Sequence, residues 1–128
     1  MAEEFAVRTS KGRQLIDITD EVSARVKGKE GICLIYVPHA TAGLIINEDE
    51  SNLASDFEKL FERLAPKNEK WAHNKIDDNA HAHLLSGLVS PSVCVPVVNG
   101  KLALGTWQRI LLCEFDGPRE RKVMVVVR

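Results

Sequence analysis

The five residues from Asn79 to His83 read NAHAH and contain two of the four histidines in the chain. His73 lies a few residues upstream, and His39 lies in the stretch PHATAG. The charge of histidine changes near neutral pH, and its ring is the commonest metal ligand in proteins. Packing does not require histidines to cluster, so the cluster indicates a functional site, although polar residues also gather by chance in surface loops.

His81 and His83 can face one site only if their segment is extended. Alternate side chains of a strand lie on one face, and both rings could then hold one metal ion. On a helix, side chains two positions apart point about 200° away from each other. The sequence favours a short helix that begins near Asn79, a residue type suited to a helix cap. We therefore expect His81 to be the reactive histidine and His83 to pack or to cap.

Side chains that follow predicted strands are further candidates. His39 comes after an apolar strand and a proline, where a loop on a rigid strand can project it into a cleft. Asn47 and Glu48 come directly after another strand and are candidates for ligand contacts. Asp49 and Glu50 need no functional role to explain their presence, because negative charge is favourable at the N-terminus of the helix that follows.

Glu114 and Asp116 alternate across Phe115 at the end of an apolar strand, so both should lie on one face. A carboxylate that is buried without a partner is costly. Each group therefore reaches solvent or meets a partner, which is a histidine, a metal ion or one of the nearby residues Arg119 and Arg121. A catalytic and a structural role for Glu114 are equally open.

Trp107 and Gln108 follow a glycine at an expected strand bend, where a tryptophan either joins the core or lines a pocket. Cationic groups that could hold a phosphate occur at four positions: Lys75, Arg109, Arg119 and Arg121. The sequence contains no P-loop or glycine-rich phosphate cradle to organise them, and it contains no GxSxG motif.

The elements that must position these groups are predicted from hydrophobic spacing. Apolar residues at spacings of three and four indicate a helix over residues 51–64, with Ser51 as its cap. The apolar run 31–37 is typical of a strand buried on both faces, and residues 99–100, Asn-Gly, mark a hairpin turn. The remaining elements are expected to be helices at about 19–27 and 79–88 and strands at 44–46, 93–98, 101–106, 109–115 and 122–127.

The polar segment 10–12 ends in glycine and predicts a further hairpin, between strands at 5–9 and 13–18. The expected order of elements is ββαββααββββ. Hairpins dominate and parallel βαβ crossovers do not recur, so we expect an α+β fold with mainly antiparallel sheet and two or three helices. The whole chain, residues 1–128, is expected to form a single domain.

The formal net charge of the 128-residue chain is −1, which gives no electrostatic footprint for binding nucleic acid. No run of about 18 apolar residues would span a membrane. The N-terminus lacks the pattern of a secretory signal, so a cytoplasmic protein is expected. Cys33, Cys94 and Cys113 each lie in an apolar run and are expected to be buried structural thiols rather than nucleophiles.

Four segments carry a resemblance to a known family. They are HATAGLIINEDE at 39–50, the polar stretch at 73–78, NAHAH at 79–83 and LGTWQRILLCEFDGPR at 104–119. Together, in this order, they resemble the YjbQ-like family, which is also called the secondary thiamine-phosphate synthase family. The loop WAHNKIDDN departs from the family pattern, which has more glycine there. The resemblance implies a small α+β fold, a homotrimer and thiamine-phosphate synthase activity that is a side activity at best.

The resemblance and the residues together predict a small trimeric enzyme that acts on a small-molecule substrate at a histidine–carboxylate site. The alternative is a non-catalytic module that binds a metal ion or a small molecule. A divalent ion, Mg or Zn, would suit histidine ligands with one open position. The expected catalytic residues are His81, His39 and Glu114, and the expected metal ligands are His39, His81 and His83. The expected substrate-binding residues are Thr41, Asn47, Glu48, Asn79, Trp107, Gln108 and Arg109, and the resemblance adds Asp78 and Asp116 as polar site positions.

Overall fold

The computed structural model describes residues 2–128 and has the predicted order of elements, with one short 3-10 helix, η1, added. No helix in these residues is both long and apolar enough to cross a membrane. The elements are β1 (Glu3–Arg8), β2 (Gln14–Asp17), α1 (Thr19–Val26), β3 (Gly31–Tyr36), β4 (Ala42–Asn47), α2 (Ser51–Leu64), η1 (Ala72–Lys75), α3 (Ala80–Val89), β5 (Ser92–Val98), β6 (Lys101–Leu102), β7 (Arg109–Glu114) and β8 (Glu120–Val127).

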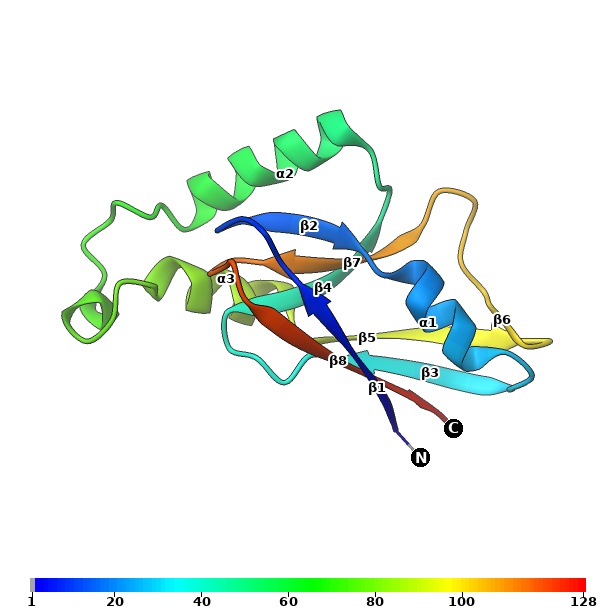
Figure 1. Ribbon diagram of the computed structural model, residues 1–128. Coiled ribbons are helices and arrows are strands. Elements are labelled where there is room, and N and C mark those ends of the chain that lie inside the picture. Colours follow the sequence, from blue (N-terminus) through cyan, green and yellow to red (C-terminus); the bar gives the residue numbers. More distant parts are fainter. Residues whose placement is uncertain (1) are drawn as a thin grey trace.

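The strands form two sheets that pack face to face (Figure 1). The larger sheet has the strand order β1-β8-β3-β5-β6, and the smaller has the order β2-β7-β4. Each of these strand pairings is antiparallel. The expected α+β class with mainly antiparallel sheet is therefore confirmed.

The first hydrophobic core lies between the two sheets. Ile35 and Val125 of the larger sheet belong to the same buried cluster as Leu44 and Leu112 of the smaller one. Helix α1 adds Val22 to this cluster, because its apolar residues recur every four positions and form one stripe. Burying this many branched side chains removes apolar surface from water, which is the main stabilising term for a fold of this size.

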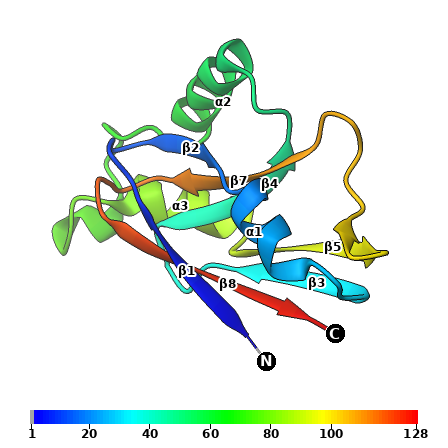
Figure 2. The ribbon, with the colours of Figure 1, turned by 45° about the vertical axis from the view of Figure 1, so that its right-hand side comes forward.

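A second core lies on the other face of the smaller sheet, under α2 and α3. Phe61 of α2 meets Phe115 edge to face, with 5.1 Å between ring centroids, and Leu85 of α3 and Cys113 of β7 join them. Figure 2 shows α2 lying across the smaller sheet on the side away from β8. Strand β7 is therefore buried on both faces, which makes it a rigid support for residues at its two ends.

Two predictions about strands are wrong. The segment 10–12 does not close a hairpin, because β1 pairs with β8 and β2 pairs with β7, so the segment carries the chain from one sheet to the other. Strand β3 is not buried on both faces: Ile32, Leu34 and Tyr36 are exposed and alternate with buried residues. The apolar composition of β3 resembles that of a central strand because its outer face, although uncovered, is also apolar.

The outer face of the larger sheet stays open to solvent in one chain. Ile32 is 58% exposed and Val98 is 52% exposed. Cys94, on β5 directly opposite Leu34, is exposed on the same face, so the prediction of a buried thiol is wrong there. A continuous apolar surface on a sheet is a common mark of a protein interface.

The other two cysteines are buried as predicted. Burial raises the pKa of the Cys33 thiol to about 11 and that of the Cys113 thiol to about 12. Both thiols therefore stay protonated at neutral pH, and neither is a nucleophile in this fold.

Candidate functional site

A cleft of about 510 Å³ lies beside His81, the histidine that the sequence singled out. The cleft is bordered by the 12–13 turn before β2, by helix α2 and by the loop before α3, while Phe115 and Asp116 line it at the end of β7. Four segments of the chain therefore meet around one ring. Such a place can hold a small molecule while keeping much of it from water.

Helix α3 begins at Ala80 and separates the two histidines of the NAHAH segment, as expected for a helix. His81 is only 6% exposed and lines the cleft. His83 packs against His73 instead, with 4.7 Å between ring centroids and a near-perpendicular angle of 74°. Only His81 is thus placed to act in the cleft.

The ring of His81 is held neutral and is free to interact with a ligand. Burial lowers its pKa, the nearby cations Arg13 and Lys67 lower it further, and Asp116 and Glu62 only partly oppose them. No hydrogen bond to another group of residues 2–128 holds the ring, and neither of its nitrogen atoms is sealed from the cleft. A neutral imidazole in such a place can accept a hydrogen bond or a proton.

Asn79 occupies the cap position of α3, but its side chain does not cap the helix. Its Nδ2 donates to Oδ2 of Asp116 at 3.0 Å, and its Oδ1 lies 3.1 Å from Nε2 of His73. Arg119 donates from Nη2 to the same Asp116 oxygen at 3.1 Å, and the first amide of α3 donates to Asn74 instead. Asn79 therefore links the start of α3 to the loop after β7 and fixes Asp116 beside the cleft.

Glu114 forms a closed, fully buried network. It is 0% exposed and is paired with Arg121, which is 2% exposed. The Oε1 atom accepts from Thr9 at 2.8 Å and from Nε of Arg121 at 2.9 Å, and Oε2 accepts from the Asp116 amide at 3.0 Å and from Nη2 of Arg121. Arg121 also donates to Thr41. Because both carboxylate oxygens are occupied, the geometry favours the structural alternative for Glu114.

The charge state of Glu114 agrees with this structural role. Burial alone would raise the pKa of Glu114, but hydrogen bonds from Arg121, the Asp116 amide and Thr9 lower it overall. The carboxylate is therefore ionised at neutral pH and matches the permanent charge of Arg121. Thr41, predicted to contact substrate, serves here as an acceptor for Arg121.

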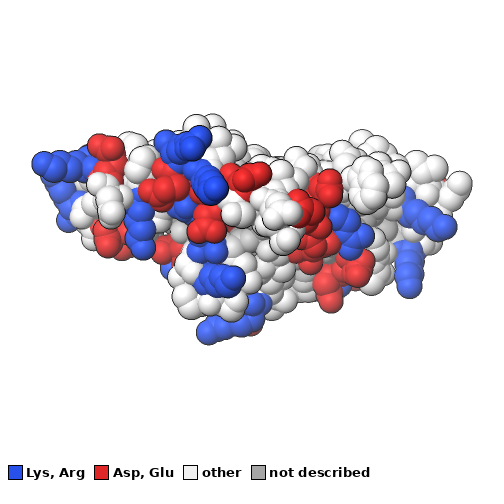
Figure 3. Space-filling view, turned by 90° about the horizontal axis from the view of Figure 1, so that it is seen from above, with Lys and Arg blue, Asp and Glu red and all other residues white. Residues whose placement is uncertain are grey.

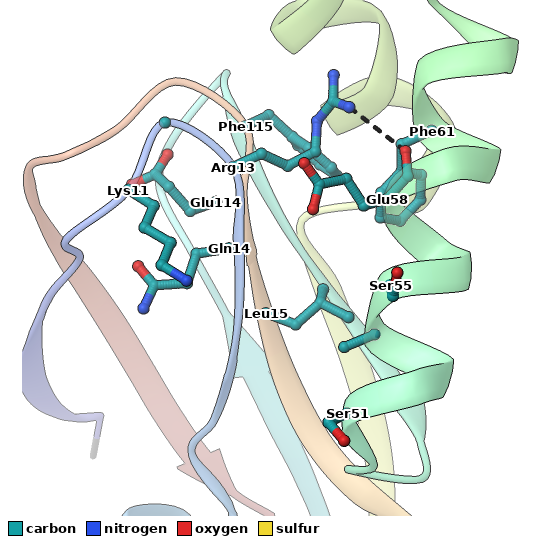
Figure 4. A pocket seen from close by; sticks show the side chains of 12 residues that line it. Lys11, Arg13, Gln14, Leu15, Ser51, Ser55, Glu58, Phe61, Glu114 and Phe115 are labelled. Carbon is teal, nitrogen blue, oxygen red and sulfur yellow. Dashed lines mark hydrogen bonds between the residues drawn. The ribbon is translucent and has the colours of Figure 1, made fainter.

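A neighbouring cavity of about 640 Å³ continues along α2 and shares Arg13 with the His81 cleft. Figure 4 shows Arg13 reaching from the chain before β2 toward α2, with Ser51 and Ser55 further along the same helix. Its Nη1 and Nη2 make contacts of 3.4 Å with the Glu58 carbonyl and the Glu62 carboxylate. Its Nε is buried without a partner within residues 2–128, so Arg13 keeps an unused hydrogen-bond donor near the residues that the two cavities share.

His39 lies away from the His81 cleft, in a separate cavity with Phe5 and Arg121. Its Nε2 accepts a hydrogen bond of 2.8 Å from the Lys122 amide, which requires that this nitrogen carry no proton. Burial and the charge of Arg121 lower its pKa. His39 is thus neutral and bonded to the backbone, and it lines no cavity in common with His81.

Several other predicted site residues lie at the opposite end of the smaller sheet. In the β4–β7 register Ala42 faces Glu114 and Asn47 faces Arg109, so the two ends are about 17 Å apart at about 3.4 Å per residue. We call them the Glu114 end and the Arg109 end. The predicted residues at the Arg109 end are Asn47, Glu48, Trp107, Gln108 and Arg109.

The residues of the Arg109 end are bound mainly to their own surroundings. Arg109 donates from Nε to Asp17 at 2.6 Å and from Nη2 to Asp20 at 3.2 Å. Gln108 accepts from the Gly105 amide through its side-chain oxygen at 2.8 Å, and Trp107 is 72% exposed. The substrate site predicted from the sequence therefore divides into two groups of residues that do not meet within one chain.

The expected three-histidine metal site is not assembled in one chain. Within residues 2–128, no group of three histidine, cysteine, aspartate or glutamate side chains is placed to hold a metal ion. His39 is bonded to a backbone amide, His81 faces the cleft and His83 packs on His73. These donors do not fit Mg or Zn here, and a bound divalent ion stays a prediction that metal analysis of the purified protein would test.

The two cations of the cleft were not found from the sequence. Arg13 lies on the turn before β2, and Lys67 follows the proline that ends α2, and both line the cleft with His81. Neither belongs to a recognisable motif, and 53 positions separate them. They meet only because α2 packs across the smaller sheet. No local sequence pattern predicts this packing.

Comparison with known proteins places the chain among relatives of the same size and shape. The family model described as "UPF0047 protein YjbQ-like" matches residues 3–128. The chain belongs to the YjbQ-like UPF0047 family. A UPF0047 protein of Archaeoglobus fulgidus is 49% identical over 95% of this chain and 97% of its own length, and UPF0047 protein YugU of Bacillus subtilis is 41% identical over 94% of each chain.

Solved structures agree with this membership. A YbjQ-like protein of unknown function from Sulfolobus solfataricus superposes with a TM-score of 0.95 at 43% identity, covering 98% of this chain and 94% of that chain. The hypothetical protein APE1520 of Aeropyrum pernix superposes with a TM-score of 0.96 at 40% identity, over 100% and 98% of the two chains. The family resemblance seen in the sequence is thus confirmed, and so is the fold.

The comparisons overturn the expected activity. The named relatives carry only the family description, and the Sulfolobus structure is described as that of a protein of unknown function. The assignment as a thiamine-phosphate synthase is therefore wrong. Its physical basis is also absent, because the histidines and cations chosen for it lie in different parts of the fold.

Proposed function

We propose that the chain binds a small polar molecule in the His81 cleft, and that the neutral ring of His81 accepts a hydrogen bond or a proton from it. One observation carries the proposal. His81 is almost completely buried, its pKa is lowered, and its ring has no hydrogen-bond partner among residues 2–128 although it borders a cleft. Because neither ring nitrogen is sealed from the cleft, a ligand there can bond to the ring without first breaking a hydrogen bond inside the protein.

The other walls of the cleft support a ligand with several polar groups. The volume of about 510 Å³ lies in the range of small-molecule sites. Arg13 and Lys67 contribute positive charge, and Glu58 and Glu62 contribute negative charge, so the cleft offers both donors and acceptors. Asp116 is held in place by Asn79 and Arg119, and a fixed carboxylate orients a ligand without first having to be ordered.

Ligand-observed NMR with a library of polar metabolites tests this proposal. Saturation transfer should identify binders of the parent protein, and His81→Asn should weaken them strongly because it removes the ring that they contact. His83→Asn is the matched control, since that residue is on the same helix but packs against His73. Equal binding by parent and His81→Asn, with both proteins folded, would contradict the assignment of this cleft.

We also propose that three copies of the chain associate in the cytoplasm through the open face of the larger sheet. The uncovered apolar side chains of Ile32, Leu34 and Val98 support an interface there, and the number three rests on the family resemblance. Light scattering should give about three times the chain mass, and Leu34→Lys should dissociate the assembly without unfolding it. A monomeric parent protein at micromolar concentration would refute the association.

A further inference from the structure

A further cavity, of about 470 Å³, lies at the Arg109 end and has no part in the proposed function of His81. It is enclosed by the C-terminal half of α1, the β5–β6 turn and the loop from 103 to 108, which Figure 1 shows beside one another. Three segments that are distant in the sequence thus build a cavity of the size that holds small organic molecules.

The charged residues that line this cavity are all cations. Lys27, Lys101 and Arg109 line it, and none of its lining residues is an aspartate or a glutamate. Seen from above in Figure 3, the extreme right-hand end of the molecule shows only Lys and Arg colouring, whereas both signs mix over the left half. Among residues 2–128 neither lysine pairs with a carboxylate, since the ion pairs of this end are those of Arg109 with Asp17 and Asp20.

Neutral donors accompany the positive charges. Ser23 of α1 and Thr106, which carry hydroxyl groups, also line the cavity. The Gln108 side chain uses its oxygen to accept from the Gly105 amide, which leaves its NH₂ group available to a ligand. The charged residues that line the cavity are all cations, and of these only Arg109 is paired with carboxylates of residues 2–128, those of Asp17 and Asp20. An anion is therefore the ligand that these groups favour.

Two glycines allow the β5–β6 turn to lie close to the end of α1 beneath the cavity. Gly100 has a φ of +73°, and a Cβ atom there would lie 2.8 Å from the Gly28 amide nitrogen. Only glycine fits this approach of the β5–β6 turn to the end of α1. The turn therefore brings Lys101 near Lys27, although the two lysines are far apart in the sequence.

The cavity also has an apolar part. Val26, Leu102 and Leu104 line it, and Trp107, between two lining residues, is 72% exposed. When a ligand ring stacks on an indole that is this exposed, the contact is favourable. We propose that this cavity is a binding site for a small organic anion, in which the lysines hold a phosphate or carboxylate group and Trp107 covers an aromatic or apolar body.

Amide NMR spectra of the full chain, titrated with phenyl phosphate, test the site. Saturable shifts are expected at the amides of Gly28, Gly100 and Gln108 and at the Trp107 indole. A parallel titration with benzoate compares a carboxylate with a phosphate. The probe that binds more tightly shows which of these two anionic groups the site prefers. Absence of saturable shifts with both probes would overturn the proposal.

Variants separate a built site from general attraction between opposite charges. The double variant Lys27→Gln/Lys101→Gln should bind phenyl phosphate about tenfold more weakly, because each lysine contributes a charge-assisted hydrogen bond. The matched control Lys59→Gln/Lys70→Gln removes the same charge elsewhere and should bind like the parent. Equal weakening in both double variants would show non-specific attraction and refute the site.

Trp107→Ala tests the apolar part separately. It should weaken phenyl phosphate more than inorganic phosphate, because only phenyl phosphate has a ring to stack. An equal effect on the two probes would refute the role of Trp107. Unchanged amide spectra outside the 103–108 loop would show that the variant is folded.

Discussion

The two ends of the smaller sheet each carry an arginine paired with a carboxylate, yet the two pairs differ in burial. At the Glu114 end, both partners are sealed from solvent and every carboxylate oxygen is bonded. At the Arg109 end, the arginine side chain is 38% exposed and its partner Asp17 is 19% exposed. The sequence presents both arginines as candidate anchors, but only burial decides which one is part of the framework.

The difference extends to what each end can bind. The Glu114 end lies next to a cleft with mixed charges and a neutral histidine, whereas the Arg109 end borders a cavity lined by cations without carboxylates. A buried ion pair whose donors and acceptors are all bonded inside the protein has none left for a ligand. The ligand contacts that we propose are therefore made by neighbouring groups. At the Glu114 end that group is His81, and at the Arg109 end it is Lys27 and Lys101, which have no carboxylate partner within residues 2–128.

The largest expected effect compares the two ion pairs directly. Glu114→Gln should lower the free energy of unfolding by about 3–5 kcal/mol, because it leaves the buried Arg121 guanidinium without its counter-charge. Asp17→Asn should cost roughly 1–2 kcal/mol, mainly through weaker hydrogen bonds to Thr19. Urea unfolding measures both values. Equal costs would remove the distinction between the two ends.

A glycine at each end gives the next comparison. At Gly117 an added Cβ would lie 2.3 Å from the Lys11 carbonyl and 2.8 Å from Cγ of Glu114, whereas at Gly105 the nearest atom, on Gln108, is 3.4 Å away. Gly117→Ala should therefore destabilise the fold by about 1–3 kcal/mol through overpacking, and Gly105→Ala should change stability little. Thermal melts of the two variants decide the matter, and a well-tolerated Gly117→Ala would contradict the close packing described.

The dependence of stability on pH distinguishes His81 from the ion pair beside it. Because the pKa of His81 is lowered in the fold, the unfolded chain takes up protons below pH 6.5 that the folded chain does not. Stability must then fall as the pH drops below 6.5, and His81→Asn should reduce that loss. Part of the loss of stability should remain in this variant, because the pKa of His39 is lowered as well.

Glu114 acts in a different pH range. Its pKa is lowered from 4.5, so its stabilisation is present above that pH and is lost only as the pH falls through the folded value. Urea unfolding at a series of pH values, with an NMR titration of the His81 ring, separates the two ranges. An unchanged pH dependence in His81→Asn would contradict a neutral His81.

The smallest expected effect tests whether the stability cost of removing a carboxylate charge depends on its place in the fold or on its burial. Glu62 lies at the Glu114 end but is half-exposed, and it meets Arg13 at 3.4 Å. Glu62→Gln should change the free energy of unfolding by less than about 1 kcal/mol, as for other surface pairs. A cost close to that of Glu114→Gln would mean that the whole end, rather than the buried pair, is sensitive to charge.

Much of the fold could be predicted because its signals are local. The spacing of apolar residues gave α2 its observed bounds, Ser51–Leu64, and the Asn-Gly turn joins β5 to β6 as expected. The cap of α2 differs by one residue, since Glu50 rather than Ser51 accepts from the first amides of the helix. Neighbouring residues compete for such caps through small differences in backbone angles, which a sequence does not show.

The site was predictable only in part, for a similar reason. The separation of His81 from His83 follows from the period of a helix, and the structure agrees. The meeting of Arg13 with His81 depends on how α2 crosses the smaller sheet, and the division between the Glu114 and Arg109 ends depends on strand register. Both are long-range properties, and a single sequence carries no local signal for them.

The pairing of β1 with β8 has a consequence for how the protein is made. Glu3 lies opposite Val125, and the two ends of the chain lie close together in both ribbon views (Figures 1 and 2). Strand β1 is synthesised before the other strands of the described chain, but its only strand partner there is β8, which is synthesised after all of them. The larger sheet can therefore close only after β8 has been made, which leaves an early strand exposed to other partners and to chaperones. A circular permutant that joins residue 128 to residue 1 and opens the chain elsewhere should shorten that interval.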